Sequence, residues 1–550
     1  MNPRVGTWAA LSVLVMAALA VAVGFLVPLY SDEIAMQMAR SRYFAEGGHL
    51  LGLLPQCGDV WQDVPISWIP GAVLNALLYA GASEWGLRLR GIALCLVWMA
   101  LLWIWAGRHP QTLLSRRGFQ ALVVSLNLLG VMPLLLVLAR SEQLMVIALA
   151  AYGLLPLYAA VDTRDGAAGK AAKTVLFIAL HSVFLMAHPK ALFFAPMMLL
   201  SSWLVFRRDR WLCMGMVLIT GFMIAQTFQH ARTIGVCANA PVVSQMLTQQ
   251  TLDLSLIGRD PSAFVAAALH NLIAAPRLVI DRVPVTISFQ SNWLPTLDNA
   301  SAGAVLTVFG QVLKFSLWGG LLLLIAGVIF RALSSWRHFH ANEATWLALA
   351  LLASLMIHAS VYSPAIWHFY TPGLIVPAAI LLLMLVLHRP VGNMRWMRIG
   401  ARAVACWVWV LAVASLALLL GVVTPRLVQV ARADDFVIAG QPLSTPVFLS
   451  KARRSDMQRL AAQCRIRDGD DRLMIDGSGY FAFQHGQKPI NVLYVSSYAF
   501  GGDIGSRLPE FLAQKSSAGV VARCEYLPAE LLERATHSGS MCCVPRAALR

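Results

Sequence analysis

The sequence predicts a polytopic α-helical membrane protein that ends in a small α/β domain, and three observations support this fold class. Hydrophobic residues make up 58% of the 550 positions and charged residues only 13%, with a mean hydropathy of +0.66. A soluble domain does not need so much apolar surface. Long apolar runs recur up to residue 424 and stop beyond it, and basic residues gather between alternate runs.

Apolar runs near the length that crosses a bilayer, about 20 residues, predict about eleven spans. The expected spans are residues 8–29, 86–106, 119–138, 142–160, 173–188, 191–206, 211–229, 303–330, 344–361, 365–388 and 402–423. The first run is long for a signal peptide, and Pro28-Leu29-Tyr30 is not a small-residue cleavage site. We therefore expect this run to be a retained anchor.

The distribution of basic residues predicts the orientation of the chain. Sixteen of its 43 Lys and Arg, but only four of its 27 Asp and Glu, lie in residues 1–7, 107–118, 161–173, 206–211, 331–343 and 389–402. Such an excess of Lys and Arg marks the cytoplasmic side of a membrane protein. We expect a bacterial inner (plasma) membrane protein with a cytoplasmic N-terminus and, after an odd number of spans, an extracytoplasmic C-terminus. The basic composition then reports topology and not nucleic-acid binding.

This orientation divides the chain into a transmembrane domain, residues 1–424, and an extracytoplasmic α/β domain, residues 425–550. The transmembrane domain carries two long outer segments, residues 30–85 and 230–302. In the tail, residues 451–463 read as a helix, and residues 473–475 and 492–495 read as strands. Six cysteines fall in outer segments, where disulfides can form. Their pairing is left open by the sequence, with Cys464 to Cys524 as one guess.

The most informative ionisable residues are Asp32 and Glu33, directly after the first span. Two adjacent acids at a membrane boundary are costly to desolvate, so a functional role is favoured over a solvated helix cap. More ionisable and aromatic side chains map to the outer ends of other spans. Each of these has a simpler explanation as well: Arg140 and Glu142 can pair at a boundary, Lys190 can extend to the interface, and Tyr370 can belong to an aromatic belt.

Four short motifs follow the acidic pair in a recognisable order. They are Gly81-Ala82-Ser83-Glu84 with Arg88, Ala139-Arg140-Ser141-Glu142, His188-Pro189-Lys190-Ala191, and Trp367-His368-Phe369-Tyr370. Together with the first span they resemble the GT-C membrane glycosyltransferases, especially protein O-mannosyltransferases and lipid A aminoarabinose transferases, over about residues 1–390. Two departures stand out: His-Pro-Lys replaces a commoner Thr-Lys-Gly-type turn, and His368 stands where many relatives have Arg. The donor sugar and the acceptor therefore do not carry over from any one relative.

The resemblance implies a GT-C-like catalytic domain that transfers a sugar from a polyprenyl-phosphate-linked donor to an envelope glycan, lipid or protein on the outer face. Such a reaction needs a carboxylate base and cationic partners for the leaving phosphate. Asp32 is the expected base, with Glu33 supporting it or binding the acceptor. The expected phosphate ligands are Arg140, His188, Lys190 and His368, and the expected further contacts to donor or acceptor are Glu84, Arg88, Glu142 and Tyr370. One base opposite the phosphate predicts inversion at the anomeric carbon.

Two other functions stay open at this stage: a transporter or flippase of a lipid-linked sugar, and a polysaccharide polymerase or ligase. Transporters place their charges near the bilayer midplane within inverted repeats, whereas these charges map to span ends on one face. The sequence has no Walker-type loop and no zinc-ligand spacing. No cofactor is implied with certainty, and a divalent cation at Asp32 and Glu33 is left open.

Overall fold

The structure is a computed structural model of the full chain. It describes residues 3–34, 39–42, 44, 47, 50–51, 61–62, 64–111, 113–162, 165–234, 250–287, 294–297, 300–335, 343–363, 369–388, 395–432, 444–448, 451–483, 490–491, 504–514 and 516–549.

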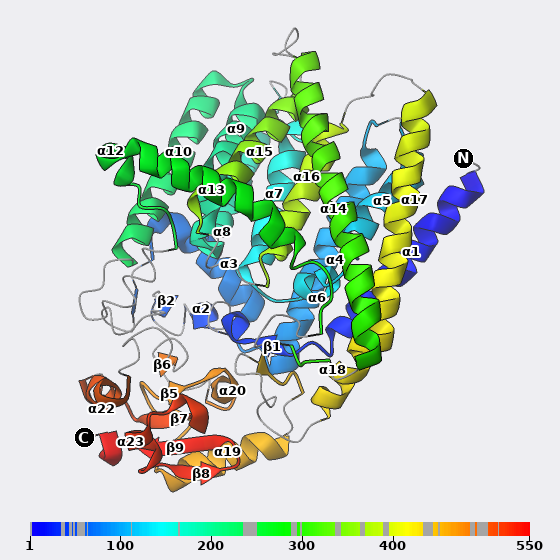
Figure 1. Ribbon diagram of the computed structural model, residues 1–550. Coiled ribbons are helices and arrows are strands. Elements are labelled where there is room, and N and C mark those ends of the chain that lie inside the picture. Colours follow the sequence, from blue (N-terminus) through cyan, green and yellow to red (C-terminus); the bar gives the residue numbers. More distant parts are fainter. Residues whose placement is uncertain are drawn as a thin grey trace.

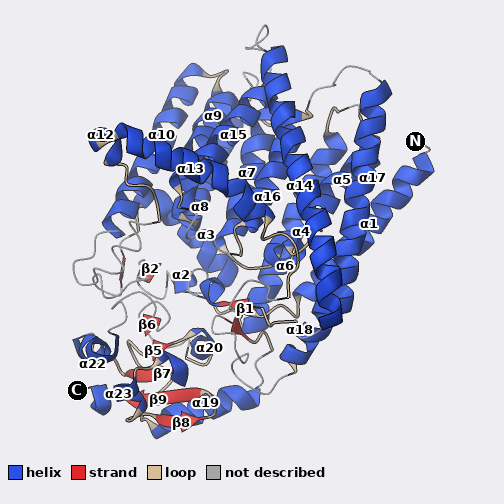
Figure 2. Cartoon of the chain, in the orientation of Figure 1, coloured by secondary structure: helices blue, strands red, loops and turns tan. Residues whose placement is uncertain are grey.

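A bundle of long helices forms most of the molecule, and a small domain of strands and short helices lies at one end of it (Figures 1 and 2). The bundle helices are α1 Pro3–Gly24, α2 Ala39–Ser41, α3 Ile69–Tyr79, α4 Glu84–Arg108, α5 Arg116–Leu126, α6 Met132–Leu136, α7 Ser141–Tyr158, α8 Ala167–Ala187, α9 Ala195–Phe206, α10 Arg210–Ile234, α12 Leu256–Arg259, α13 Pro261–Ile280, α14 Ala300–Ser335, α15 Glu343–Val361, α16 Pro372–Val386, α17 Arg395–Leu418 and α18 Thr424–Ala431. Tighter or wider turns are the 3₁₀ helices η3 Ile66–Trp68 and η4 Pro189–Phe194 and the π-helical turn η7 Leu419–Val423.

Ten helices within the described part of the chain are long and apolar enough to cross a membrane, by length and composition. They include α1, α4, α7, α8, α10, α14 and α15, where the sequence also predicts spans. Many of their large apolar side chains are exposed on the outside of the bundle, as expected for a lipid-facing surface. The prediction of a multi-pass helical membrane protein is therefore confirmed.

Three of the predicted segments need correction. The segment 119–138 is not one helix, because it is divided into α5 and the short α6. The helix expected over 365–388 is only Pro372–Val386, which is 15 residues long. Conversely, α13 meets the criteria of a span although the sequence places it in an outer segment. In Figure 1 α13 runs obliquely across the other helices, with its C-terminal part near α14.

A close backbone contact explains the break between α5 and α6. Gly130 has a φ of 55°, and a Cβ atom there would collide with the carbonyl oxygen of Val283. That carbonyl accepts a hydrogen bond of 2.8 Å from the amide of Val131. The chain thus leaves the helical path where the segment that follows α13 packs against it, which a hydropathy plot does not report.

The tail contains a five-stranded sheet in the order β6-β5-β7-β9-β8. The strands are β5 Met474–Ile475, β6 Ile490–Asn491, β7 Gly519–Arg523, β8 Thr536–Ser538 and β9 Met541–Pro545; the helices are α19 Lys451–Gln463, α20 Gly477–Tyr480, α22 Ile504–Gln514, α23 Ala529–Leu532, η9 Cys524–Tyr526 and η10 Arg546–Leu549. The β5 strand is parallel to β6 and β7, and the other pairs are antiparallel. The predicted helix 451–463 is confirmed as α19 and the strand 473–475 as β5, whereas 492–495 lies outside the described residues.

The disulfide pairing guessed from the sequence is wrong. Cys464 is bonded to Cys543, and Cys524 is bonded to Cys542. Adjacent residues of a strand point to opposite faces of a sheet, so the neighbours on β9 reach partners on different sides. Cys57 and Cys237, the other outer cysteines, lie outside the described residues.

The tail packs directly on the point where α1 leaves the bundle. Strand β1 Leu29–Tyr30 pairs with β4 Ser444–Thr445 in an antiparallel ladder. One hydrophobic cluster joins Leu29, Ile34 and Tyr79 of the bundle to buried residues of α19 and the sheet. A second small ladder, β2 Leu50–Leu51 with β3 Trp61–Gln62, lies in the first outer segment. The exit of α1, with the acidic pair, is therefore held between the two parts of the chain.

Candidate functional site

Glu33 and Arg88 form an ion pair that is completely buried. The two guanidinium nitrogens Nη1 and Nη2 donate to the two carboxylate oxygens over 3.0 and 2.9 Å, and both side chains are 0% exposed. Glu33 also accepts hydrogen bonds from the backbone amides of Tyr30 and Ala139. Each oxygen of Glu33 thus has two donors, so this carboxylate is occupied in holding the structure together.

Arg88 completes this arrangement from the first turns of α4. Its guanidinium donates to the carbonyl oxygens of Val27, Pro28 and Val137, in addition to Glu33. These carbonyls belong to the end of α1 and to the turn before α7. The pair therefore fixes three segments around the acidic turn, and a positioning role fits both residues better than contact with a substrate.

Asp32 lies beside Glu33 in the sequence but in a different environment. Its side chain is 19% exposed, and its Oδ2 accepts a hydrogen bond of 2.6 Å from Nη1 of Arg140. Of the two acids, only Asp32 reaches solvent in part. This carboxylate can therefore meet a molecule that approaches the site.

Arg140 is the residue that joins Asp32 to the rest of the site. It precedes α7 with an extended backbone, φ −102° and ψ 163°, and its side chain is 5% exposed. Its Nε lies 3.1 Å from Oε2 of Glu142, and the centre of its guanidinium lies 3.5 Å from the ring centroid of Tyr370. Burial raises the pKa of the Tyr370 phenol well above its usual range, so a neutral ring faces the cation.

The turn between α8 and α9 brings a second cation to Glu142. Nζ of Lys190 lies 3.3 Å from Oε1 of Glu142 and about 5 Å from the ring centroids of Tyr362 and Tyr370. His188 precedes it in an extended conformation, and its Nδ1 accepts a hydrogen bond from the amide of Lys190. Burial and the charge of Lys190 hold the pKa of His188 well below its usual range, so its Nε2 carries the proton and can donate.

The structure does not place the two other predicted site residues, Glu84 and His368, among these contacts. Glu84 is buried at the start of α4 and forms an ion pair with Arg454 of α19, which joins the bundle to the tail. Contact of Glu84 with a substrate stays a prediction. His368 lies outside the described residues, so the structure places Tyr370 but not the histidine of that motif.

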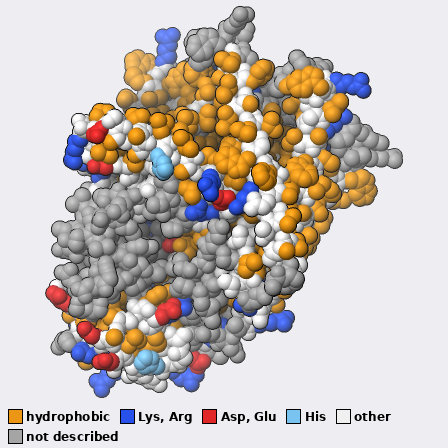
Figure 3. Space-filling view, in the orientation of Figure 1, with side chains coloured by type: hydrophobic (Ala, Val, Ile, Leu, Met, Phe, Trp, Pro, Cys, Tyr) orange, Lys and Arg blue, Asp and Glu red, His pale blue; other side chains and the backbone are white. Residues whose placement is uncertain are grey.

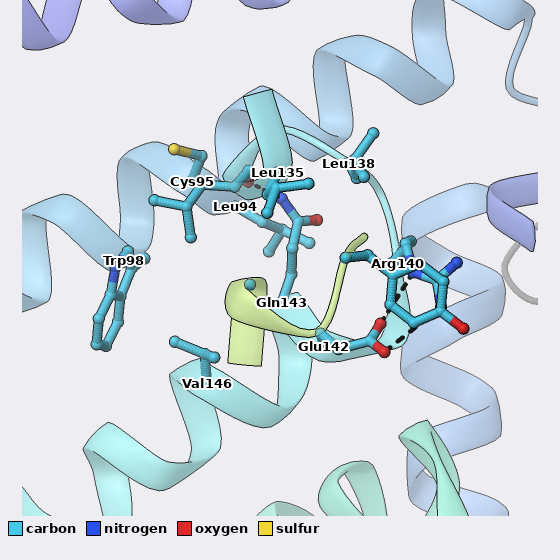
Figure 4. A pocket seen from close by; sticks show the side chains of 12 residues that line it. Leu94, Cys95, Trp98, Leu135, Leu138, Arg140, Glu142, Gln143 and Val146 are labelled. Carbon is cyan, nitrogen blue, oxygen red and sulfur yellow. Dashed lines mark hydrogen bonds and ion pairs between the residues drawn. The ribbon is translucent and has the colours of Figure 1, made fainter. Parts of the chain in front are cut away.

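A pocket begins at this charge cluster and continues between apolar side chains. Arg140, Glu142 and Tyr370 line one part of it, and Leu94, Cys95, Trp98, Leu135 and Val146 line another. Figure 4 shows Arg140 and Glu142 facing one another on one side and Trp98, Leu94 and Cys95 on the other. The enclosed space is about 20 Å³, room for a single water molecule, so a ligand with a polar and an apolar part could enter only if the lining side chains moved apart.

Metal ligands were also sought among the described residues. The sulfurs of Cys524 and Cys542 and a nitrogen of His537 lie close enough together to hold an ion. The two sulfurs are bonded to one another, however, and thiolates are the form that binds a metal. At the acidic pair, both oxygens of Glu33 already have their donors, so a divalent cation there would depend on Asp32.

The sequence reasoning missed three members of this region. Tyr30 and Tyr362 contribute ring faces to Arg140 and Lys190, and Arg454 pairs with Glu84. Tyr30 sits next to the acidic pair, and its position alone could have drawn attention to it. Nothing in the sequence connects Tyr362 or Arg454 to the site, because both come from distant segments.

Comparisons with known proteins give only weak similarities to solved structures. No protein-family model matches the chain, and no curated protein matches it. Among solved structures, it is similar to the oligosaccharyltransferase AglB of Archaeoglobus fulgidus in complex with an inhibitory peptide and a dolichol-phosphate, with a TM-score of 0.42 and 11% identity over 94% of this chain and 69% of that chain. It is also similar to ArnT from Cupriavidus metallidurans bound to undecaprenyl phosphate, with a TM-score of 0.39 and 13% identity over 99% of both chains. Similarity at this level carries no argument about function, which is therefore argued from the site.

Proposed function

We propose that the chain is a glycosyltransferase of the GT-C kind, which moves a sugar from a polyprenyl-phosphate-linked donor to an envelope glycan, lipid or protein. The observation that carries the proposal is the Asp32–Arg140 pair at the polar end of the pocket. It combines a partly exposed carboxylate with a buried cation, beside an apolar lining. A base, a phosphate ligand and an apolar surface for the lipid are features that this reaction requires.

The phosphate of the donor would bind to Arg140 and Lys190. Glu142 contacts both cations and so holds them side by side, at 3.1 and 3.3 Å. Arginine binds phosphate oxygens through a planar fork, and lysine adds a compact charge. His188 is placed to donate a hydrogen bond from Nε2. The apolar lining between Trp98 and Val146 would take the first part of the polyprenyl chain.

Phosphate binding would also change the state of Asp32. In the structure the carboxylate of Asp32 holds Nη1 of Arg140, and a donor phosphate would compete for the same guanidinium. Once Arg140 turns to the phosphate, the Asp32 carboxylate becomes available to the acceptor. Arg140 then couples donor binding to activation of the base, because it can hold either the phosphate or Asp32.

The transfer step follows from these positions. The acceptor hydroxyl gives its proton to Asp32 while its oxygen forms a bond to the anomeric carbon of the sugar. The bond between that carbon and the phosphate oxygen breaks, and its electron pair stays on the phosphate, where Arg140 and Lys190 stabilise the charge. Attack on the side opposite the phosphate inverts the anomeric carbon.

The orientation and location proposed for the enzyme rest on the charges of the chain. The basic segments alternate with the spans, and the site and the tail lie together at the ends that follow the odd-numbered predicted spans. We infer an inner-membrane enzyme with a cytoplasmic N-terminus and an extracytoplasmic tail. The tail would then border the side from which the acceptor arrives.

The test is transfer from a panel of radiolabelled polyprenyl-phosphate monosaccharides to cell-envelope acceptors by the purified protein. Wild type should form a glycosidic product, and Asp32→Asn should lower the rate by about a hundredfold or more, the usual contribution of a general base. Asp471→Asn is the matched control, because Asp471 is exposed in the tail, and it should keep full activity.

Other outcomes would contradict the proposal. Movement of the labelled lipid across the membrane without a new glycosidic bond would indicate a transporter. Activity only with lipid-linked oligosaccharides would indicate a polymerase or ligase. Full activity of Asp32→Asn would remove Asp32 from the role of the base.

A further inference from the structure

A second group of charged side chains lies away from the candidate site, where the end of α13 meets α14. Nζ of Lys314 on α14 lies 2.8 Å from Oδ1 of Asp281, and Nε of Arg277 on α13 lies 3.5 Å from Oδ2 of the same residue. Arg282 follows Asp281, and its guanidinium donates to the carbonyl oxygen of Leu278 over 2.7 Å. Two cations thus contact one carboxylate and a third follows it in the chain, which leaves the group with a net charge of +2.

The packing of the chain after α13 makes this group a fixed feature. Gly310 and Gly303 on α14 allow close approach of Pro284 and Ile287, respectively, so the segment after Arg282 runs along the outer part of α14. Val283 is in turn fixed to the turn between α5 and α6. The three cations are therefore held near one another by the backbone around them.

The surroundings of this charged group are apolar and exposed. Ile273 on α13 is 76% exposed, and Val308 and Phe315 on α14 are 66% and 75% exposed. Figure 3 shows a small group of basic and acidic side chains near the middle of the view, with hydrophobic side chains along its upper side. A soluble ligand would meet mostly apolar side chains there, whereas acyl chains would match them.

The length of α14 places the group near the boundary of the bilayer. From Phe315 to Leu333 the helix has one charged residue, Arg331, which is buried against Thr345 and the carbonyl of Val386. These residues span about 28 Å at about 1.5 Å each, close to the hydrocarbon thickness of about 30 Å. The basic loop after α14 marks one boundary, so Lys314 falls at the other, where lipid phosphates lie.

Clustered cations are unexpected at that boundary. Of the 27 Lys and Arg in residues 1–424, 16 lie in the predicted loops of the opposite face, and cations between spans commonly bind lipid head groups. We propose that Arg277, Arg282 and Lys314 bind the phosphate of an anionic phospholipid, whose acyl chains lie along Ile273 and Phe315. Asp281 keeps the arginine and lysine side chains apart and oriented until the phosphate arrives.

The experiment measures phosphatidylglycerol bound to the purified full-length protein by native mass spectrometry, with phosphatidylcholine and inorganic phosphate as separate probes. Arg277→Gln/Lys314→Gln should lower the affinity for phosphatidylglycerol about thirtyfold, from about 1 kcal/mol for each cation near a membrane surface and a factor of ten for each 1.4 kcal/mol. The matched control is Arg210→Gln/Arg395→Gln, which removes two exposed cations from the ends of α10 and α17 and should retain wild-type binding.

A variant expected to raise the affinity tests the proposal even if the double variant does not fold. Asp281→Asn raises the net charge of the group to +3 and should tighten phosphatidylglycerol binding by about fivefold. Three results would overturn the proposal. The control pair could lose as much affinity for phosphatidylglycerol as the double variant, or the wild type could bind phosphatidylcholine as tightly as phosphatidylglycerol. The affinity could also stay unchanged in both the double variant and Asp281→Asn. Binding of inorganic phosphate as strongly as the lipid would show that the acyl chains are not recognised, and would overturn it as well.

Discussion

Two ion pairs involve the neighbouring residues Glu33 and Asp32, and they differ in whether the carboxylate is accessible to a ligand. In the Glu33–Arg88 pair both side chains are 0% exposed, and the remaining donors and acceptors meet backbone groups. In the Asp32–Arg140 pair the carboxylate is 19% exposed, and the guanidinium stacks on Tyr370 beside a pocket. The comparison teaches that an acid next to a span is not functional by position alone: its other partners decide whether it supports the fold or meets a ligand.

The largest expected effect is on stability, from Glu33→Gln. Loss of one partner leaves Arg88 charged and buried, which costs about 3–5 kcal/mol. Thermal unfolding in detergent should show a clearly lower Tm for Glu33→Gln and a Tm close to wild type for Asp32→Asn. Equal Tm values for wild type and Glu33→Gln would contradict a stabilising role of the Glu33–Arg88 pair.

The next effect is on donor binding, from Arg140→Lys. Lysine keeps the charge but loses the planar fork and the close stacking on Tyr370. We expect KM for the polyprenyl-phosphate donor to rise about tenfold, measured by initial rates over a range of donor concentrations. Arg432→Lys, at the exposed position directly after α18, should leave KM unchanged. An unchanged KM in Arg140→Lys would mean that the phosphate binds elsewhere.

The smallest effect concerns the Glu84–Arg454 pair, in which one side chain is buried and the other is partly exposed. Glu84 is buried, but the Arg454 side chain is 32% exposed, so the pair is expected to contribute only about 1 kcal/mol to docking of the tail. Limited proteolysis of the tail should be about fivefold faster in Glu84→Gln and in Arg454→Gln. The double variant should be no worse than either one. Additive effects would show that the two residues act independently.

The sequence predicts much of this architecture because hydropathy and charge report it directly. The long spans, the helix α19 and the positions of Arg140, His188 and Lys190 at the same ends of the spans follow from local patterns. The sequence also predicts that these three residues lie close together, since residues at the same ends of packed spans lie near each other. The different roles of Asp32 and Glu33 do not follow, because burial of Glu33 depends on the amide of Ala139 and on Arg88, distant in sequence.

The failures share a physical cause, which is that tertiary contacts override local patterns. The break between α5 and α6 depends on the carbonyl of Val283, a residue distant in sequence. The disulfide guess failed because pairing depends on which face of β9 each cysteine occupies. A spacing rule carries none of this information.

The most direct test of the central claim measures sugar transfer and polyprenyl phosphate binding side by side in Asp32→Asn. If Asp32 is the base and Arg140 the phosphate ligand, transfer should fall by about a hundredfold or more while binding stays equal or becomes tighter, since Arg140 loses its competing carboxylate. Retained transfer, or loss of transfer and binding together, would contradict this account.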